Sequence, residues 1–200
     1  YLSMGDWMDV SMPIHFIGFG EKSLRFAGRH FDGVHLHTFI TDQGLQRARS
    51  LVQEGAELAG RDTNSVTLYS VVATAINPTE EDRLRKLVAR MATYMQAPGY
   101  AEMLIALNDW DIKVLEEFRA HPLVSSMPGG IDSVATLEQL REISDLIPRE
   151  WLPAAVGTPR QCAQTWHRQL QLGADGVVIH GSTPTEFEPI LAEYKALRNA

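Results

Sequence analysis

The residues of this chain best suited to chemistry are two glycines at one turn and two histidines at the ends of apolar runs. Gly18-Phe19-Gly20 follows the apolar run that starts at Ile14 and precedes a helical pattern over 22–30. Glycines at a strand-to-helix turn let backbone amides approach a phosphate at the positive end of the helix. A tight turn with positive φ explains the same glycines without a ligand, and the spacing alone does not separate these interpretations.

Two common nucleotide-binding fingerprints fail at this turn. Ser23 stands where the dinucleotide fingerprint needs its third glycine. The ending of a phosphate loop is also absent, because Glu21 precedes Lys22 and Ser23. The turn is therefore neither a Rossmann nor a P-loop fingerprint, and phosphate binding stays a hypothesis.

His37 and His180 each end an apolar run with the composition of a strand. Polar residues at the carboxyl ends of parallel strands surround the ligand in α/β barrels and open α/β sheets. We therefore predict that both contact substrate or cofactor, and they are the only candidates for catalysis. His35 alternates with His37, but no Asp, Glu or Cys joins the pair at ligand spacing, so we predict no metal site. Surface or helix-packing positions are predicted for His15, His30, His121 and His167.

Four apolar runs are predicted to be the strands that position these residues. They cover 14–18, 34–37, 66–76 and 177–180. The run at 66–76 is rich in β-branched residues and nearly continuous, which predicts a strand buried on both faces. Helical patterns follow at 22–30, at 43–59 and from 184 to about 197. Strands that alternate with helices predict a parallel sheet and an α/β fold.

The stretch over 77–155 is far longer than the minimal crossover of about a dozen residues between parallel strands. Its helical patterns predict an insertion, and insertions of this kind often shape the substrate pocket. Thr79 is predicted to cap its first helix, and Thr158 and Thr183 each begin a capping box further along the chain.

Two short segments of the chain resemble each other, and this internal echo supports a repeated strand-helix unit. The segment 32–37 matches the segment 175–180 everywhere except at His35 against Val178, when leucine and isoleucine are counted as similar. Each copy has Asp-Gly before the strand and histidine at its end, which predicts structurally equivalent units.

The composition favours one domain over residues 1–200, with a small molecule as partner. The 200 residues carry 18 Lys plus Arg against 25 Asp plus Glu, a net charge of −7, which argues against nucleic acid as a partner. No stretch approaches the roughly 20 apolar residues of a membrane span, and we expect a cytoplasmic protein. The lone Cys162 falls in a helical pattern and is predicted to be core rather than nucleophile. The start at Tyr1 predicts a fragment of a longer protein, with an intact short protein as the alternative.

Several stretches together resemble the luciferase-like monooxygenase superfamily, and are most similar to its coenzyme F420-dependent oxidoreductases. The resemblance covers nearly the whole chain, and the order and spacing of the stretches carry it more than any single motif. The stretches are Pro13-Ile14-His15-Phe16-Ile17-Gly18-Phe19-Gly20, residues 24–34, residues 54–62, Val156-Gly157-Thr158-Pro159 and residues 172–179.

The resemblance implies an eight-stranded TIM-like (β/α)8 barrel of which this chain holds about the C-terminal half. It implies that Gly18, Phe19, Gly20 and Glu21 contact the phosphate-bearing chain of the cofactor, and that Thr38 lies at a cofactor or substrate contact. Glu21 departs from the family, whose members often have proline there. Its carboxylate would weaken phosphate binding unless it turns away or pairs with Lys22 or Arg25.

The activity implied is hydride transfer between a deazaflavin and a small organic substrate, with the cofactor carrying the reactivity. The usual acid-base residues of the family would lie on the earlier strands. An FMN-dependent monooxygenase and a non-catalytic flavin-binding protein are the alternatives. A half barrel exposes unpaired sheet edges, so we expect a homodimer or association with an N-terminal half.

Overall fold

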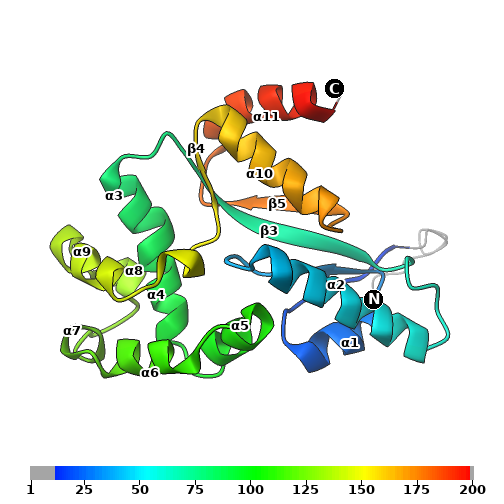
Figure 1. Cartoon of the computed structure of the whole chain (residues 1–200), viewed down its shortest axis with the longest axis horizontal. Helices are drawn as coiled ribbons and strands as arrows, with labels where there is room; N and C mark the ends of the chain where they lie inside the picture. The colour runs from blue at the N-terminus through cyan, green and yellow to red at the C-terminus, as the bar shows by residue number, and fades with distance from the viewer. Residues whose placement is uncertain (1–11, 199–200) are drawn as a thin grey trace, which may run out of the picture.

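The structure, a computed structural model, describes residues 12–198 and contains five strands that pair in parallel (Figure 1). They are β1 (His15–Ile17), β2 (Gly33–His35), β3 (Thr67–Ile76), β4 (Ala155–Gly157) and β5 (Gly176–His180). β3 is central, because it pairs with β2, β4 and β5, while β1 pairs with β2. The predicted parallel α/β sheet is confirmed. Residues 1–11 and 199–200, including the start at Tyr1, lie outside the described part of the predicted domain.

Two strand predictions need correction. The strand predicted over 34–37 ends at His35, since after the bond from Leu36 N–H to the Tyr69 carbonyl (2.9 Å) the chain turns away. Phe39 takes a left-handed φ of 64° within that turn. His37 therefore lies beyond the strand that was expected to carry it. β4 has only three residues, too few for a spacing pattern, and was anticipated only through the resemblance around Val156.

Four long helices flank the sheet. α1 (Glu21–His30) and α2 (Asp42–Leu58) lie beside β1 and β2, whereas α10 (Pro159–Gln171) and α11 (Pro184–Arg198) lie beside β5 (Figure 1). The predicted caps are confirmed. Thr79 and Thr158 form reciprocal capping boxes, and Thr183 exchanges hydrogen bonds with Glu186. Cys162 is fully buried in α10, as predicted, and burial raises the pKa of its thiol to about 11.

The first half of β3 is buried on one face only, which corrects the expectation of a strand buried on both. Leu68, Ser70 and Val72 are buried, while Tyr69 and Val71 between them are partly exposed. The buried face packs on α10, where Ser70 Oγ donates to Gln169 Oε1 at 2.7 Å. Residues 73–75 are buried. The strand is therefore half-covered near its start and enclosed near its carboxyl end.

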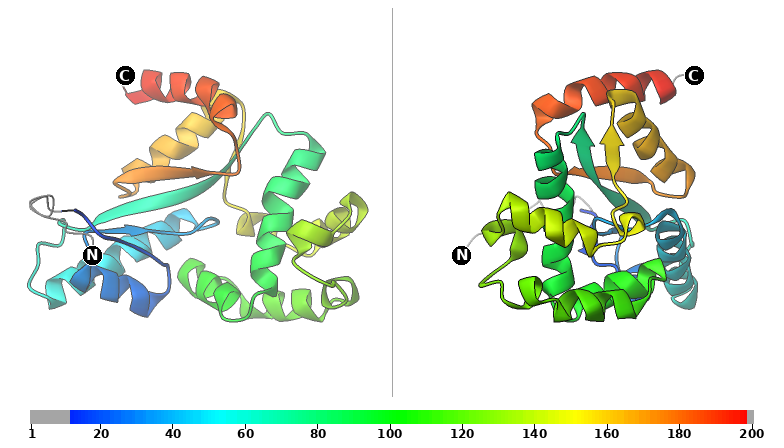
Figure 2. Two further views of the ribbon diagram at one scale, coloured as in Figure 1. Left: turned by 180° about the vertical axis from the view of Figure 1, so that it is seen from behind. Right: turned by 60° about the vertical axis from the view of Figure 1, so that its left-hand side comes forward.

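The chain between β3 and β4 is helical and extends beyond the carboxyl end of β3 (Figure 2). Its elements are α3 (Glu80–Arg83), a π-helical turn η2 (Leu84–Val88), α4 (Ala89–Gln96), α5 (Tyr100–Asn108), α6 (Ile112–Ala120), α7 (Pro122–Ser125), α8 (Ile131–Val134), α9 (Leu137–Asp145) and a 3₁₀ turn η3 (Arg149–Trp151). None of the helices within residues 12–198 is long and apolar enough to cross a membrane.

The two copies of the internal echo make the same backbone contacts. Asp32 N–H donates to the Ile14 carbonyl at 3.0 Å, and the Asp32 carboxylate accepts from Ile14 N–H at 2.8 Å. Asp175 repeats both bonds with Leu68, at 2.8 and 2.7 Å. Each aspartate thus joins the start of its strand to the start of a neighbouring one, which confirms the predicted equivalence at the strand starts and explains the shared Asp-Gly. The strand ends differ, because His180 ends β5 whereas His37 lies beyond the end of β2.

Replacing Asp175 by alanine is expected to lower the free energy of unfolding by about 2 kcal/mol, because Leu68 N–H loses a charged acceptor. The change also removes the carboxylate that pairs with Arg49. Urea denaturation of Asp175→Ala measures the loss. Asp62→Ala, which removes a carboxylate bonded only within its own exposed turn, is the control. Equal midpoints for the two variants would show that the Asp175 bridge contributes nothing.

Candidate functional site

His37 lies at the centre of an aromatic cluster beside the carboxyl ends of β1 and β2. Its ring is perpendicular to the rings of Tyr94 and Tyr100, with centroids 4.8 and 5.1 Å away. The Phe19 ring lies 5.6 Å from His37 and 5.0 Å from Tyr100. The glycine turn, the segment after β2 and the insertion each contribute a side chain to this cluster.

The surroundings of His37 keep its imidazole neutral. Burial lowers its pKa from 6.5 to about 4, and the charges of His180 and Arg90 act in the same direction. A hydrogen bond with the Thr38 backbone opposes this fall in pKa only in part. The Thr38 hydroxyl also lies 3.1 Å from His37 Nδ1. At neutral pH His37 is therefore an uncharged group that is able both to donate and to accept a hydrogen bond.

His180, the last residue of β5, lies at the same end of the sheet. Burial, followed by the charge of Arg90, lowers its pKa. Its Nδ1 is buried and has no hydrogen-bond partner among the described residues. Because buried polar atoms are nearly always hydrogen-bonded, an unpartnered one beside a candidate site marks hydrogen-bonding capacity that the described residues leave unused.

His35 does not join this site. Its Nε2 lies 3.0 Å from Nδ1 of His15, and its ring stacks on Tyr69 with centroids 4.6 Å apart. His15 is partly exposed, in line with the surface position predicted for it, and it pairs with His35 across β1 and β2. Within residues 12–198 no group of three or more His, Cys, Asp or Glu side chains could hold a metal ion.

Neither glycine of the turn has a positive φ. Gly20 caps α1 with φ −73°, and Gly18 is not among the residues with positive φ. Close contacts restrict both positions instead, and Gly18 more than Gly20, because the Met103 side chain opposite Gly20 is flexible and 41% exposed. A Cβ on Gly18 would lie 2.5 Å from the Phe16 ring, and one on Gly20 would lie 3.0 Å from Met103 Sδ. The interpretation as a positive-φ turn is wrong, whereas the phosphate-binding hypothesis stays a prediction.

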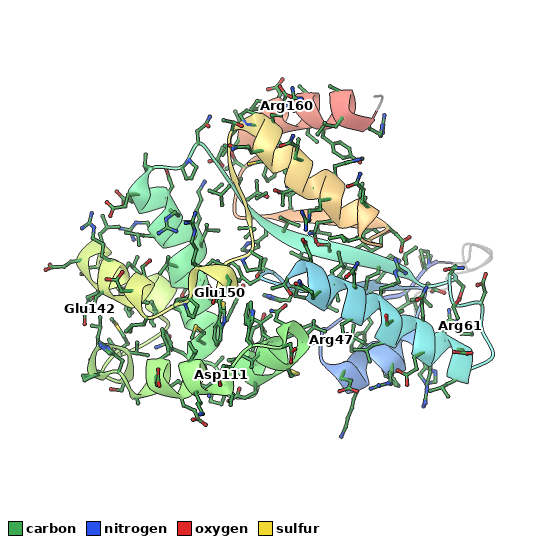
Figure 3. All side chains as sticks on the ribbon, viewed as in Figure 1. Arg47, Arg61, Asp111, Glu142, Glu150 and Arg160 are labelled. Atoms are coloured by element: carbon green, nitrogen blue, oxygen red, sulfur yellow. The ribbon has the colours of Figure 1, made fainter. Side chains whose placement is uncertain are left out.

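Glu21 is turned away from the start of α1. Its carboxylate accepts from Arg25 Nη1 at 2.5 Å, and Arg25 Nε also bonds Glu54 at 2.8 Å. A cavity of about 210 Å³ lies beside Gly20 and Glu21, and Arg47 lines it from α2. Arg47 reaches the last carbonyls of α5 from this position (Figure 3). The N-terminal, positive end of α1 and the Arg47 side chain thus line the same cavity.

Two predicted cofactor contacts have buried side chains. Phe19 is 6% exposed and packs into the aromatic cluster, so its backbone is the part that can meet a ligand. Thr38 is 1% exposed, and its hydroxyl hydrogen-bonds with the His37 ring. The structure thus brings Phe19, Thr38 and His37 together, with Gly18, Gly20 and Glu21 on the adjoining turn.

Three residues of the site, all from the insertion, were not predicted from the sequence. Tyr94 and Tyr100 flank the break at 97–99, and Arg90 lies with its guanidinium carbon 6.0 Å from the Tyr94 centroid. The Tyr100 hydroxyl is buried without a partner among the described residues, and burial raises its pKa. Arg90 follows the π-helical turn η2, a rare feature that often marks functional sites. That turn is the one signal that could have indicated them, but it is visible only in three dimensions.

Chemically, the site offers an aromatic wall, two histidines held neutral and one nearby guanidinium. The unpartnered Nδ1 of His180 and hydroxyl of Tyr100 can hydrogen-bond a polar ring edge. These groups, with the start of α1, fit a planar cofactor that carries a phosphate. These groups account for binding of a cofactor and not for catalysis, because within residues 12–198 we identify no carboxylate in the site that could act as a general base.

Comparisons with known proteins agree with this architecture. The sequence model of the family described as luciferase-like monooxygenase matches residues 6–176. The chain has no match among curated proteins. A coenzyme F420-dependent tetrahydromethanopterin reductase from Methanopyrus kandleri superposes with TM-score 0.63 at 16% identity, over 92% of this chain and 48% of that one.

Two further solved structures share the fold. An F420-dependent secondary alcohol dehydrogenase, in complex with an F420-acetone adduct, gives TM-score 0.54 at 13% identity over 92% of this chain and 48% of its own. A riboflavin lyase with modified FMN gives 0.55 at 18% identity over 93% and 43%. The chain thus spans less than half the length of these neighbours and is a partial luciferase-like TIM barrel. On the match over residues 6–176, it belongs to the luciferase-like monooxygenase family.

Proposed function

We propose that the protein is an F420-dependent oxidoreductase that transfers a hydride between the deazaflavin and a small organic substrate. The observation that carries the proposal is the group of two histidines with lowered pKa values and two unpartnered polar atoms, His180 Nδ1 and the Tyr100 hydroxyl. Two of the structures that share the fold are F420-dependent by their names, which supports the choice of cofactor. When bound, the deazaflavin supplies the carbon that accepts or donates the hydride.

The residues of this chain have binding and positioning roles in the proposal. The backbone amides of the turn at 18–21 hold the phosphate-bearing chain at the positive end of α1. Phe19, Tyr94 and Tyr100 exclude water from the ring, and His180 and Tyr100 hydrogen-bond its polar edge. His37 stays uncharged, so no buried positive charge opposes loss of a hydride from the substrate. The Glu21–Arg25 pair reduces the charge that Glu21 presents to the phosphate.

An FMN-dependent monooxygenase is the second candidate, favoured by the riboflavin lyase that shares the fold and is described with modified FMN. A phosphate-bearing chain at the start of α1 serves either cofactor. A non-catalytic flavin-binding protein is the third candidate, because no general acid is identified within residues 12–198. The cofactor preference and the consumption of oxygen distinguish the first two.

The exposed sheet edges lead to a proposal about partners. Among the described residues β1 pairs only with β2, and β5 only with β3, and Ile17 on the open face of β1 is 75% exposed. Unpaired edges and exposed apolar side chains favour association. We propose that either a second copy of the chain or an N-terminal half of the barrel covers them. Sedimentation of the full-length protein distinguishes a dimer from a monomer.

Titration of the full-length protein with coenzyme F420, and separately with FMN, tests the proposed function. We expect F420 to bind at least about tenfold more tightly than FMN, a difference of about 1.4 kcal/mol. Tyr100→Phe removes only the unpartnered hydroxyl and is expected to weaken F420 binding by roughly fivefold. Tyr194→Phe, on α11, is the matched control.

Preferential binding of FMN would contradict the F420-dependent oxidoreductase and favour the FMN-dependent monooxygenase. Binding of neither cofactor by the full-length protein would contradict both enzymatic candidates and the flavin-binding protein. Equal affinities of Tyr100→Phe and the unmodified protein would place the cofactor elsewhere on the chain.

A further inference from the structure

Helix α5 contacts the segment after β2 at both of its ends. At its first residue, the Tyr100 ring lies 5.1 Å from the ring of His37. At its last residue, Asn108 bonds to Phe39 and Thr41. The helix therefore spans the segment that carries His37 and is attached to it at two points.

Asn108 uses three hydrogen bonds for the second attachment. Its Oδ1 accepts from the Thr41 backbone N–H at 2.8 Å and from the Thr41 hydroxyl at 3.1 Å. Its Nδ2 donates to the Phe39 carbonyl at 2.9 Å. The side chain is 6% exposed, so water cannot easily replace these partners. An amide is the side chain that provides both an acceptor and a donor in this arrangement.

The segment held in this way has a strained backbone. Phe39 has φ 64° and is 1% exposed, and a bulky residue in the left-handed region is a genuine outlier. Such a conformation persists only where its surroundings over-determine it. Asn108 bonds the carbonyl of the strained residue itself and the amide two residues later. It is therefore placed to hold the turn against relaxation.

Gly44 lies directly against the side chain of Asn108. A Cβ on Gly44 would lie 2.5 Å from Asn108 Oδ1, which is closer than real side chains approach. Gly44 lies in the first turn of α2 and donates its N–H to the Thr41 hydroxyl at 3.0 Å. The glycine thus leaves the space that the amide of Asn108 occupies.

We propose that Asn108 is a positioning residue for the site, which holds the strained turn at Phe39 so that His37 stays packed against Tyr94 and Tyr100. The inference rests on the proposed function only in treating His37 as a site residue. The contacts of Asn108 themselves do not depend on any cofactor.

The pKa of His37, followed by NMR of its imidazole during acid titration, is the readout. The titratable and charged groups that face it are Tyr94, Tyr100, His180 and Arg90. In the unmodified protein we expect a midpoint at about 4. In Asn108→Ala the turn relaxes and His37 becomes more hydrated, so its pKa should rise toward 6.5, by at least about one unit.

Thr136→Ala is the control for general destabilisation, because it removes the capping hydroxyl of α9, far from His37 in the chain. It is expected to lower stability and leave the His37 midpoint unchanged. If Asn108→Ala does not fold, Gly44→Ala gives a second route, since its methyl group displaces the Asn108 amide without removing it. We expect the same upward shift in that variant. Alanine normally favours a helix over glycine, so a stabilised Gly44→Ala with an unchanged midpoint would contradict the proposal.

Failure of this inference and failure of the proposed function have different signatures. An unchanged His37 midpoint in both variants would overturn the positioning role, whatever the protein binds. A shifted midpoint in a protein that binds neither F420 nor FMN would keep the role of Asn108 and contradict the cofactor assignment. Hydrogen exchange of the Thr41 amide in the unmodified protein checks the bond directly, because exchange at the rate of an open loop would rule it out.

Discussion

Gly55→Ala is expected to lower the free energy of unfolding strongly, although alanine is normally the better helix former. A Cβ on Gly55 would lie 2.1 Å from the Arg25 carbonyl, and one on Gly28 would lie 2.1 Å from the Val52 carbonyl. Both obstacles are backbone atoms, so α1 and α2 would have to separate along their contact. We expect a loss of more than about 3 kcal/mol, a large part of the stability of a typical domain.

Urea denaturation followed by circular dichroism measures this effect. Gly28→Ala should behave like Gly55→Ala, because it forces the same two helices apart from the opposite side. Gly129→Ala is the control, since its Cβ would meet only a Val134 methyl group at 3.4 Å. A Gly55→Ala protein with the midpoint of the control would mean that α1 and α2 are not packed as closely as described.

Lowering the pH from about 7 to about 4 is expected to destabilise the protein through His37 by up to about 3 kcal/mol. The pKa of His37 falls from 6.5 in the unfolded chain to about 4 in the folded one, so the unfolded state binds more protons between these values. The contribution of neutral His37 is complete above pH 6.5 and is lost as the pH falls toward 4.

The carboxylates titrate in the same range, so the measurement is a difference between variants. The free energy of unfolding of His37→Gln should depend less on pH than that of the unmodified protein, because glutamine does not ionise. His30→Gln, at an exposed position near the end of α1, is the control and should keep the full dependence. Parallel pH profiles for His37→Gln and the unmodified protein would show that His37 is not buried in its neutral form.

Four of the five strands and the four long helices beside them could be predicted, in order, from the sequence alone, whereas β4 gave no spacing pattern. Thr79, Thr158 and Thr183 predicted helix starts correctly, because a cap is formed by residues within three positions of each other. The repeated Asp-Gly predicted two equivalent strand starts, and the resemblance of spaced motifs led to the family. These signals are local or sequential, and burial of apolar runs between helices left a parallel sheet as the natural arrangement.

The surroundings of the candidate site depend on contacts between residues far apart in the chain, which no local pattern predicts. His37 lies beyond its strand because the turn at Phe39 is held by Asn108, which is 69 residues away from Phe39. Tyr94 and Tyr100 reach His37 from an insertion whose helical pattern says nothing about the direction in which it folds back. Neither Gly18 nor Gly20 has a positive φ, and the side chains beside them, Phe16 and Met103, are known only from the fold. Periodicity specifies which face of an element is buried, whereas the partner on that face depends on how distant elements pack.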